Sequence, residues 1–285
     1  MSTEPDLSVV VAAYNASATI GATLRSLLAQ TLDSIEVVVV DDGSLDETAQ
    51  IVEEVQAVDA RARLISLDEN EGRSAARNRG LTEARGRWIG TCDADDLWAP
   101  RRAKRLIDAA ERRGVDVVTD DQMGFSVGPD GTIVLNHRYA SRSTLRMGRE
   151  HCFRLRGWFF VQTCSMRPIV RAAFLRRCGA DYPDHLANGE DLSFYLQLVF
   201  DSSAPCTLRV GEPLYYYREG ESTRVSEGSS DTHVLLTSYA ADRTGSRELD
   251  RWAQQAAPGR RYVERRFHRR LERHGRLEGE GAVED

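Results

Sequence analysis

The sequence predicts an α/β fold with a mostly parallel central sheet flanked by helices. Residues 7–13 and 35–40 are rich in valine, as is typical of strands that are buried on both faces. Each run is followed by an amphipathic stretch with helical spacing, over residues 18–30 and 48–58. Strands and helices that alternate in this way form right-handed βαβ units, so we expect a Rossmann-like sheet.

The alternation continues to residue 119 and then stops. Strands are predicted over residues 63–67, 88–92 and 115–119, and helices over 74–84 and 101–113. Residues 121–160 show little periodicity, which predicts an inserted hairpin with a turn at 128–131 and a variable lid. Beyond them we expect helices over 167–178 and 190–200, strands over 206–210 and 213–217, and a polar helical tail from about residue 233.

Length and composition limit the classes of protein to which the chain can belong. Its 285 residues suffice for one large α/β domain with an extension, and a net charge of −6 gives no reason to expect a nucleic-acid partner. The five cysteines show no metal-site spacing and are expected to be reduced thiols. Without a signal peptide or an 18-residue apolar stretch, the sequence predicts a soluble, cytoplasmic protein.

The Arg-rich tail carries a narrow apolar stripe of Tyr262, Phe267 and Leu271. A basic amphipathic helix of this kind can lie on the inner face of an anionic membrane, as a peripheral contact. It can equally dock on its own domain or form a homodimer, and the sequence leaves these alternatives open.

Carboxylates gather where the apolar runs end. Asp93, Asp95 and Asp96 fall within four residues, and Asp41 and Asp42 follow the valine run. Ligands of open α/β sheets bind beyond the carboxyl ends of the strands, and Mg²⁺ or Mn²⁺ is commonly held by one or two carboxylates together with substrate phosphates. The clusters therefore predict a metal–diphosphate site, with a solvated acidic turn or a helix cap as the alternative.

Five blocks of sequence, in this order, resemble the signature of inverting glycosyltransferases of family 2, which have the GT-A fold. They are SVVVAAYN (8–15), VDDGS (40–44), NEGRSAARNRG (70–80), DADD (93–96) and NGED (188–191). The resemblance covers roughly residues 7–218 and excludes the tail. Within the family, the chain looks most similar to the enzymes that build bacterial exopolysaccharide and other surface glycans.

The resemblance implies a site for a nucleotide-sugar donor, most plausibly a UDP-sugar, and for Mn²⁺ or Mg²⁺. Tyr14 and Asp42 would line the nucleobase pocket, Asp93 would face the ribose, and Asp95 would bind the cation with Asp93 as the second carboxylate. Arg77 matches the family's Ala-Arg-Asn element better than Arg73 does. The full set of donor-binding residues that it implies is Ala13, Tyr14, Asn15, Asp42, Arg73, Arg77, Asp93, Ala94, Asp95 and Arg218.

The acidic pair Glu190 and Asp191 would supply the catalytic part of the site. An inverting transfer needs a general base that takes the proton of the acceptor hydroxyl, and Asp191 matches that family position. Read without the other blocks, the pair is a favourable first turn of a helix. The acceptor would be a glycan, a lipid-linked glycan or a small natural product.

In one place the sequence departs from the family. Many relatives have a histidine after the Tyr-Arg strand, whereas Tyr217-Arg218 is followed by Glu219-Gly220. A third protein ligand for the metal is therefore in doubt. Arg218 or Arg224 could pair with the diphosphate instead, because a guanidinium binds phosphate through two parallel hydrogen bonds.

These assignments divide the chain into three parts. Residues 1–120 would bind the nucleotide sugar, residues 121–218 would bind the acceptor and carry the base, and residues 219–285 would form a loop and a helical extension. A sugar-1-phosphate nucleotidyltransferase is a competing function, but residues 12–17 (AAYNAS) form no Gly-rich triphosphate loop. A catalytically silent glycan-binding module is the other, and intact acids at the strand ends argue against it.

Overall fold

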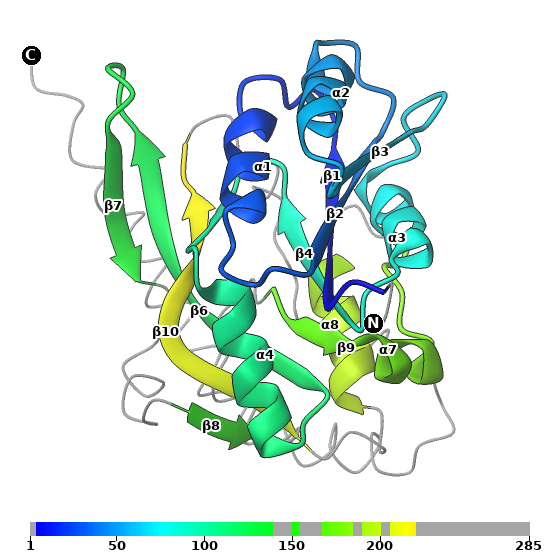
Figure 1. Ribbon diagram of the computed structural model, residues 1–285, viewed down its shortest axis with the longest axis vertical. Helices are drawn as coiled ribbons and strands as arrows, with labels where there is room; N and C mark the ends of the chain where they lie inside the picture. Colours follow the sequence, from blue (N-terminus) through cyan, green and yellow to red (C-terminus); the bar gives the residue numbers. More distant parts are fainter. Residues whose placement is uncertain (1–3, 139–149, 154–166, 185–189, 201–205, 221–285) are drawn as a thin grey trace, which may run out of the picture. The chain divides into compact units, whose positions relative to one another are not determined.

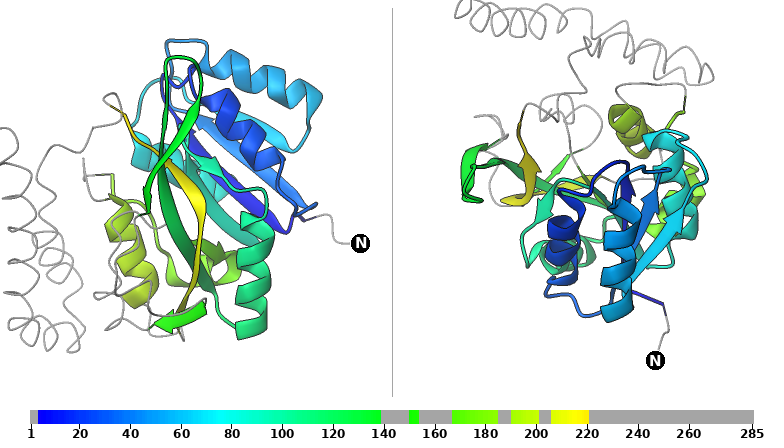
Figure 2. Two further views of the ribbon diagram at one scale, coloured as in Figure 1. Left: turned by 90° about the vertical axis from the view of Figure 1, so that its left-hand side faces the viewer. Right: turned by 90° about the horizontal axis from the view of Figure 1, so that it is seen from above.

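The computed structural model describes residues 4–138, 150–153, 167–184, 190–200 and 206–220 (Figure 1). Their strands form one ten-stranded sheet in the order β3-β2-β1-β4-β9-β6-β10-β5, with β7 paired to β6 and β8 paired to β10. Helices pack on both faces of the sheet (Figure 2). The α/β class and the Rossmann-like arrangement are confirmed.

The N-terminal half is the parallel part of the sheet. It comprises β1 (Leu7–Ala13), β2 (Ile35–Asp41), β3 (Ala62–Ser66) and β4 (Trp88–Asp93), which pair in parallel. Every residue of β2 is buried, including its four consecutive valines. Leu7 of β1 pairs with Ile35 and Trp88, so β1, β2 and β4 end at the same edge of the sheet.

Three helices cover the two faces of this parallel half. Helices α1 (Ile20–Leu28) and α2 (Thr48–Val58) share a core with the alternate valines Val9, Val11, Val37 and Val39. Helix α3 (Arg73–Glu83) packs on the opposite face, where Ala76 meets Val38 and Val40. A Cβ at Gly80 would lie 2.2 Å from a Val10 methyl, so only glycine allows α3 to approach β1 this closely.

The second half of the sheet is mixed and so departs from the mostly parallel prediction. Strand β10 (Thr207–Arg218) runs parallel to β6 (Val117–Val127), whereas β9 (Ile169–Arg171) lies antiparallel between β4 and β6. The remaining elements are β5 (Leu97–Trp98), α4 (Arg102–Arg113), β7 (Ile133–Arg138), β8 (Glu150–Phe153), α7 (Ala172–Cys178) and α8 (Glu190–Phe200).

Three predicted elements differ from the structure. The helix predicted over 167–178 begins only at Ala172, because Ile169 and Val170 are buried in β9. The strand predicted over 115–119 extends to Val127 and forms a hairpin with β7, whose predicted turn is closed by a hydrogen bond from Gly131 N to Gly128 O. The two strands predicted over 206–217 are one strand, with register shifts around Pro213.

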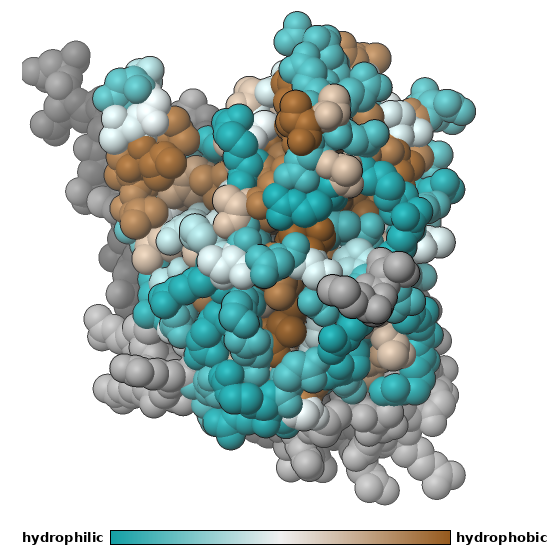
Figure 3. Space-filling model, in the orientation of Figure 1, coloured by the Kyte–Doolittle hydropathy of each residue, from teal (hydrophilic) through white to brown (hydrophobic). Residues whose placement is uncertain are grey.

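Strand β7 is exposed on the surface. Ile133, Val134 and Leu135 each expose about half of their accessible area, and Figure 3 shows an apolar patch over this strand. No helix within the described ranges has the length and apolar character needed to cross a membrane. In the described part of the chain, Cys92 and Cys152 are free thiols, as predicted. The tail and its apolar stripe, Arg224 and Cys164 lie outside the described residues.

Candidate active site

The ends of β1 and β2 are tied to the loop that leads into α3. Both carboxylate oxygens of the buried Asp42 accept backbone hydrogen bonds, from Glu71 N at 2.8 Å and from Gly72 N at 3.0 Å. Gly43 has a φ of +69°, and a Cβ there would lie 2.6 Å from the carbonyl carbon of Glu69. This turn therefore places the first residue of α3, Arg73, at the carboxyl edge of the sheet.

The predicted nucleobase residues lie at this same edge. Tyr14 follows the buried end of β1 at Ala13 and is 47% exposed, so its ring is available to a ligand. Asn15 has a φ of +49°. Its backbone N donates to Ser44 Oγ, and its side-chain oxygen accepts from the backbone N of Leu45. The two loops are thus joined by hydrogen bonds.

The three aspartates after β4 lie in different environments. Asp93 accepts a hydrogen bond from Arg77 Nη2 at 2.8 Å and is also bonded to Arg167 Nη2. Burial favours the neutral acid, but the two guanidinium groups outweigh it and hold the pKa of Asp93 well below its usual value. Asp93 is therefore charged, and both of its oxygens are engaged.

The carboxyl group of Asp95 has a higher pKa than that of an ordinary aspartate. Partial burial and the nearby charge of Asp93 raise its pKa to about 6. Its backbone carbonyl accepts a hydrogen bond from Arg218 Nε at 2.9 Å, which brings the last residue of β10 to this loop. A cation near Asp95 would offset the repulsion from Asp93 and favour the charged carboxylate.

Asp96 joins β10 to the end of β4 and is fully buried. Its Oδ2 lies 2.5 Å from the Tyr215 hydroxyl, and its Oδ1 accepts from Arg218 N at 2.8 Å. Burial, with the charges of Asp93 and Asp95, raises its pKa well above the ordinary value. Ala94 lies between these aspartates, and its carbonyl accepts from Thr23 Oγ1 at 2.9 Å.

Glu190 and Asp191 form the first turn of α8, and they meet Arg77 from far along the chain. Arg77 Nη1 donates to Glu190 Oε1 at 3.0 Å and to Asp191 Oδ1 at 3.1 Å. Glu190 is 3% exposed and lies 3.5 Å from Arg73 Nη1. The structure thus joins the predicted catalytic pair to Asp93 through one buried arginine.

Sequence reasoning missed two side chains of this cluster. Arg167 Nη1 binds Asp191 Oδ2 at 2.9 Å, and the ring of Tyr182 lies 5.1 Å from the Arg77 guanidinium carbon. Asn78 fixes Tyr182 through two hydrogen bonds with its backbone, at 2.7 and 2.8 Å. Arg167 lies outside the five blocks and has no motif, so the sequence carried no signal for it.

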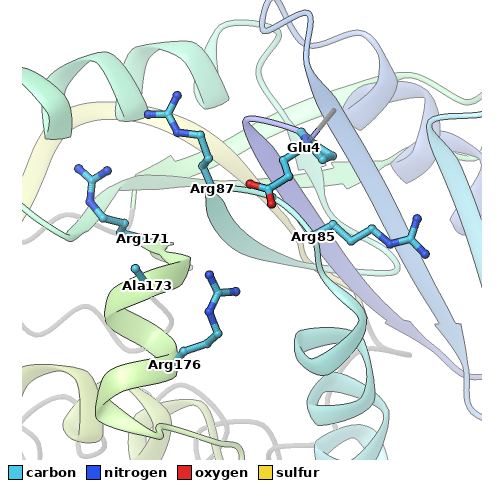
Figure 4. A pocket seen from close by; sticks show the side chains of 8 residues that line it. Glu4, Arg85, Arg87, Arg171, Ala173 and Arg176 are labelled. Atoms are coloured by element: carbon cyan, nitrogen blue, oxygen red, sulfur yellow. The ribbon is translucent and has the colours of Figure 1, made fainter. Parts of the chain in front are cut away.

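A cavity of about 820 Å³ lies at the opposite edge of the sheet, where β1 and β4 begin (Figure 4). It is lined by Glu4, Pro5, Arg85, Gly86, Arg87, Arg171, Ala173 and Arg176. None of the predicted donor-binding residues lines it. The carboxylate cluster is therefore separate from this cavity.

Comparison with known proteins identifies the family. Residues 8–176 match the family model described as Glycosyl transferase family 2. The chain belongs to glycosyl transferase family 2. The match spans four of the five blocks and ends before the Glu190–Asp191 pair.

Two curated relatives illustrate this membership. The succinoglycan biosynthesis protein ExoO of Rhizobium meliloti is 35% identical over 237 residues, which are 78% of this chain and 63% of ExoO. The uncharacterized glycosyltransferase EpsJ of Bacillus subtilis is 30% identical over 226 residues, 77% of this chain and 62% of EpsJ. The chain thus spans less than two thirds of the length of these relatives.

A solved structure confirms the GT-A fold. TarS residues 1–349 from S. aureus, in complex with UDP-GlcNAc, superpose with a TM-score of 0.70 at 25% identity, over 83% of this chain and 66% of that one. The mannosyltransferase PcManGT from Pyrobaculum calidifontis, in complex with GDP-Man and Mn²⁺, matches with a TM-score of 0.53 at 20% identity and supports the fold alone.

Proposed function

We propose that this chain is a metal-dependent, inverting glycosyltransferase. It transfers a sugar from a nucleoside-diphosphate donor to a hydroxyl acceptor, with Asp191 as the general base. The observation that carries the proposal is the convergence of Asp191, at the start of α8, with Asp93, at the end of β4, on the same buried arginine at 3.1 and 2.8 Å. It supports a base close to the edge of the sheet where α/β folds bind nucleotides.

The residues fit a divalent cation that is held by few protein ligands. No group of three or more His, Cys, Asp or Glu side chains suited to a metal occurs in the described part of the chain. Asp93 is engaged by two arginines, so Asp95 is the better of the two predicted ligands. Mg²⁺ and Mn²⁺ accept this arrangement when substrate phosphates complete the coordination. A bound cation would stabilise the charge that develops on the leaving diphosphate.

Asp191 would act at the acceptor. Each of its oxygens receives one guanidinium hydrogen bond, from Arg77 or Arg167, and a carboxylate oxygen has a second lone pair that can accept the acceptor hydroxyl. As that hydroxyl oxygen bonds to the anomeric carbon, its proton passes to Asp191. The bond between the anomeric carbon and the diphosphate breaks on the opposite face, which inverts the configuration.

The donor that we propose is a UDP-sugar. Tyr14 offers an exposed ring for the base, and Arg218 lies beside Asp95, where a diphosphate would meet the cation. TarS was solved with UDP-GlcNAc, and its likeness to this chain supports the same nucleotide. ExoO is named for succinoglycan biosynthesis, which supports a growing glycan as the acceptor.

Donor turnover tests the proposal. Wild type, Asp191→Asn and Asp95→Asn are incubated with UDP-glucose, UDP-GlcNAc or GDP-mannose and Mn²⁺. Water serves as the acceptor hydroxyl, and release of the nucleoside diphosphate by hydrolysis of the donor is followed. We expect wild type to release the nucleoside diphosphate from one of the donors, and Asp191→Asn to release it at least about 100-fold more slowly. Release of pyrophosphate from UTP and a sugar 1-phosphate would favour the nucleotidyltransferase. Nucleotide binding without turnover of any donor would favour the silent module.

A further inference from the structure

The strongest unassigned feature is a closed ring of four charged groups at the candidate base. Arg77 bonds Asp93 Oδ1 at 2.8 Å and Asp191 Oδ1 at 3.1 Å. Arg167 bonds Asp93 through Oδ2 and Asp191 Oδ2 at 2.9 Å. Two guanidinium groups and two carboxylates therefore alternate around the ring, and every carboxylate oxygen in it receives one bond.

Burial makes this ring strong. The side chains of Arg77 and Arg167 are 7% and 4% exposed, so water competes little for their hydrogen bonds. Burial alone would lower the pKa of each guanidinium, but Asp191 and Asp93 outweigh it and raise both well above the ordinary value. Both arginines are therefore permanently charged.

Arg167 is itself held in place by residues outside the ring. Its carbonyl accepts from Arg102 Nη2 at 2.6 Å, and its Nη1 lies 3.2 Å from the Tyr195 hydroxyl. The Arg102 guanidinium makes a twofold bond to Asp120 and lies 4.1 Å from the centre of the Trp98 ring. The backbone at Arg167 is thus held in place independently of the contacts that its guanidinium makes with the two aspartates.

We propose that Arg167 is a positioning residue for Asp191: it fixes the base carboxylate against Asp93 so that a free lone pair faces the acceptor. This inference rests on the proposed function, because it gives Arg167 its role through Asp191. The planar fork is essential, since it spans two carboxylates with Nη1 and Nη2, whereas a lysine ammonium is a single point of charge. Lysine at this position would keep the charge and lose the orientation.

The test compares Arg167→Lys with a matched control four residues further along the chain, at the end of β9. Arg171 also binds two carboxylates, Glu111 at 3.3 Å and Asp116 at 2.8 Å, but away from the ring. Turnover of the donor that wild type uses, among UDP-glucose, UDP-GlcNAc and GDP-mannose, is measured for wild type, Arg167→Lys, Arg171→Lys, Asp191→Asn and the double variant Arg167→Lys/Asp191→Asn. UDP affinity is measured by calorimetry for each.

We expect Arg167→Lys to lower kcat at least about tenfold with UDP affinity within about threefold of wild type, and Arg171→Lys to match wild type. The double variant should turn over as Asp191→Asn does, because residues that act as a unit are not additive. Arg167→Ala should regain part of its kcat when guanidinium chloride is added at low concentration.

Two results would overturn the inference. One is wild-type kcat in Arg167→Lys. The other is a double variant whose kcat is lower than that of Asp191→Asn by the same factor by which Arg167→Lys alone lowers the wild-type kcat. An arginine with a merely structural role would give this result. Both leave wild-type turnover intact and so leave the proposed function standing. A wild-type chain that turns over none of the donors would overturn the proposed function and the inference together.

Discussion

Replacing Arg77 with methionine should destabilise the protein strongly, because it leaves a buried carboxylate without its main partner. Arg77 contacts Asp93, Glu190 and Asp191 at 2.8 to 3.1 Å. Asp93 and Asp191 would still have Arg167, whereas Glu190 would keep, among the described residues, Arg73 at 3.5 Å. Removing one partner of a buried ion pair costs about 3–5 kcal/mol, which is our estimate for the loss in free energy of unfolding.

The measurement is urea unfolding followed by tryptophan fluorescence, with the free energy taken from the midpoint and slope. Arg79→Met is the matched control, because Arg79 lies on the same helix and pairs with Glu83 at 3.3 Å while 54% exposed. An exposed pair contributes about 0–1 kcal/mol. If Arg77→Met is too unstable to purify, Arg77→Met/Glu190→Gln should recover at least about 1 kcal/mol, since it removes the unpaired charge. Equal losses in Arg77→Met and Arg79→Met would refute the reasoning.

Three further predictions concern the base, the cation and a turn. Asp191→Asn should lower kcat about 10²–10⁴-fold with UDP affinity unchanged within about threefold, measured by steady-state kinetics and calorimetry; unchanged kcat would exclude Asp191 as the base. Because the pKa of Asp95 is raised to about 6, protons compete with Mn²⁺ below that pH, and the rise in Tm produced by Mn²⁺ should be smaller at about pH 5 than at about pH 8. Asp95→Asn should show no rise in Tm with Mn²⁺ at either pH. A rise in the Tm of wild type that is equal at the two pH values would contradict the assignment of Asp95 as a metal ligand. Gly43→Ala should lower Tm more than Gly114→Ala: both glycines have positive φ, but only at Gly43 would the new Cβ meet backbone, at 2.6 Å from Glu69.

The parallel half of the fold could be predicted because its strands are buried on both faces. The valines of β1 and β2 mark the strands, and the polar residues that follow mark the edge at which open α/β sheets bind ligands. The short strand β9 could not be predicted in the same way, because three residues carry no readable period. Its neighbours β4 and β6, which decide its pairing, are remote in sequence.

The candidate site was predictable in its residue types and only partly in its contacts. Sequence blocks gave Arg77, Asp93 and the Glu190–Asp191 pair as separate features, and the structure joins them over 113 residues of chain. Arg167 is 74 residues from Asp93, and neither a motif nor a helical or strand period connects the two. The aspartates Asp93, Asp95 and Asp96 are close together in the sequence but differ in their surroundings. Asp93 is paired with two arginines, Asp95 has a raised pKa, and Asp96 is buried. These differences depend on the arginines and tyrosines around each side chain.

Calorimetric titration of UDP tests the central claim most directly. Wild type and Asp95→Asn are titrated in the presence of Mn²⁺ and again in EDTA. The account predicts that wild type binds UDP with Mn²⁺ at least about tenfold more tightly than in EDTA, and that Asp95→Asn loses most of this difference, because a cation shared by Asp95 and the diphosphate contributes to binding. Equal affinity with Mn²⁺ and with EDTA, or no binding of UDP under either condition, would contradict it.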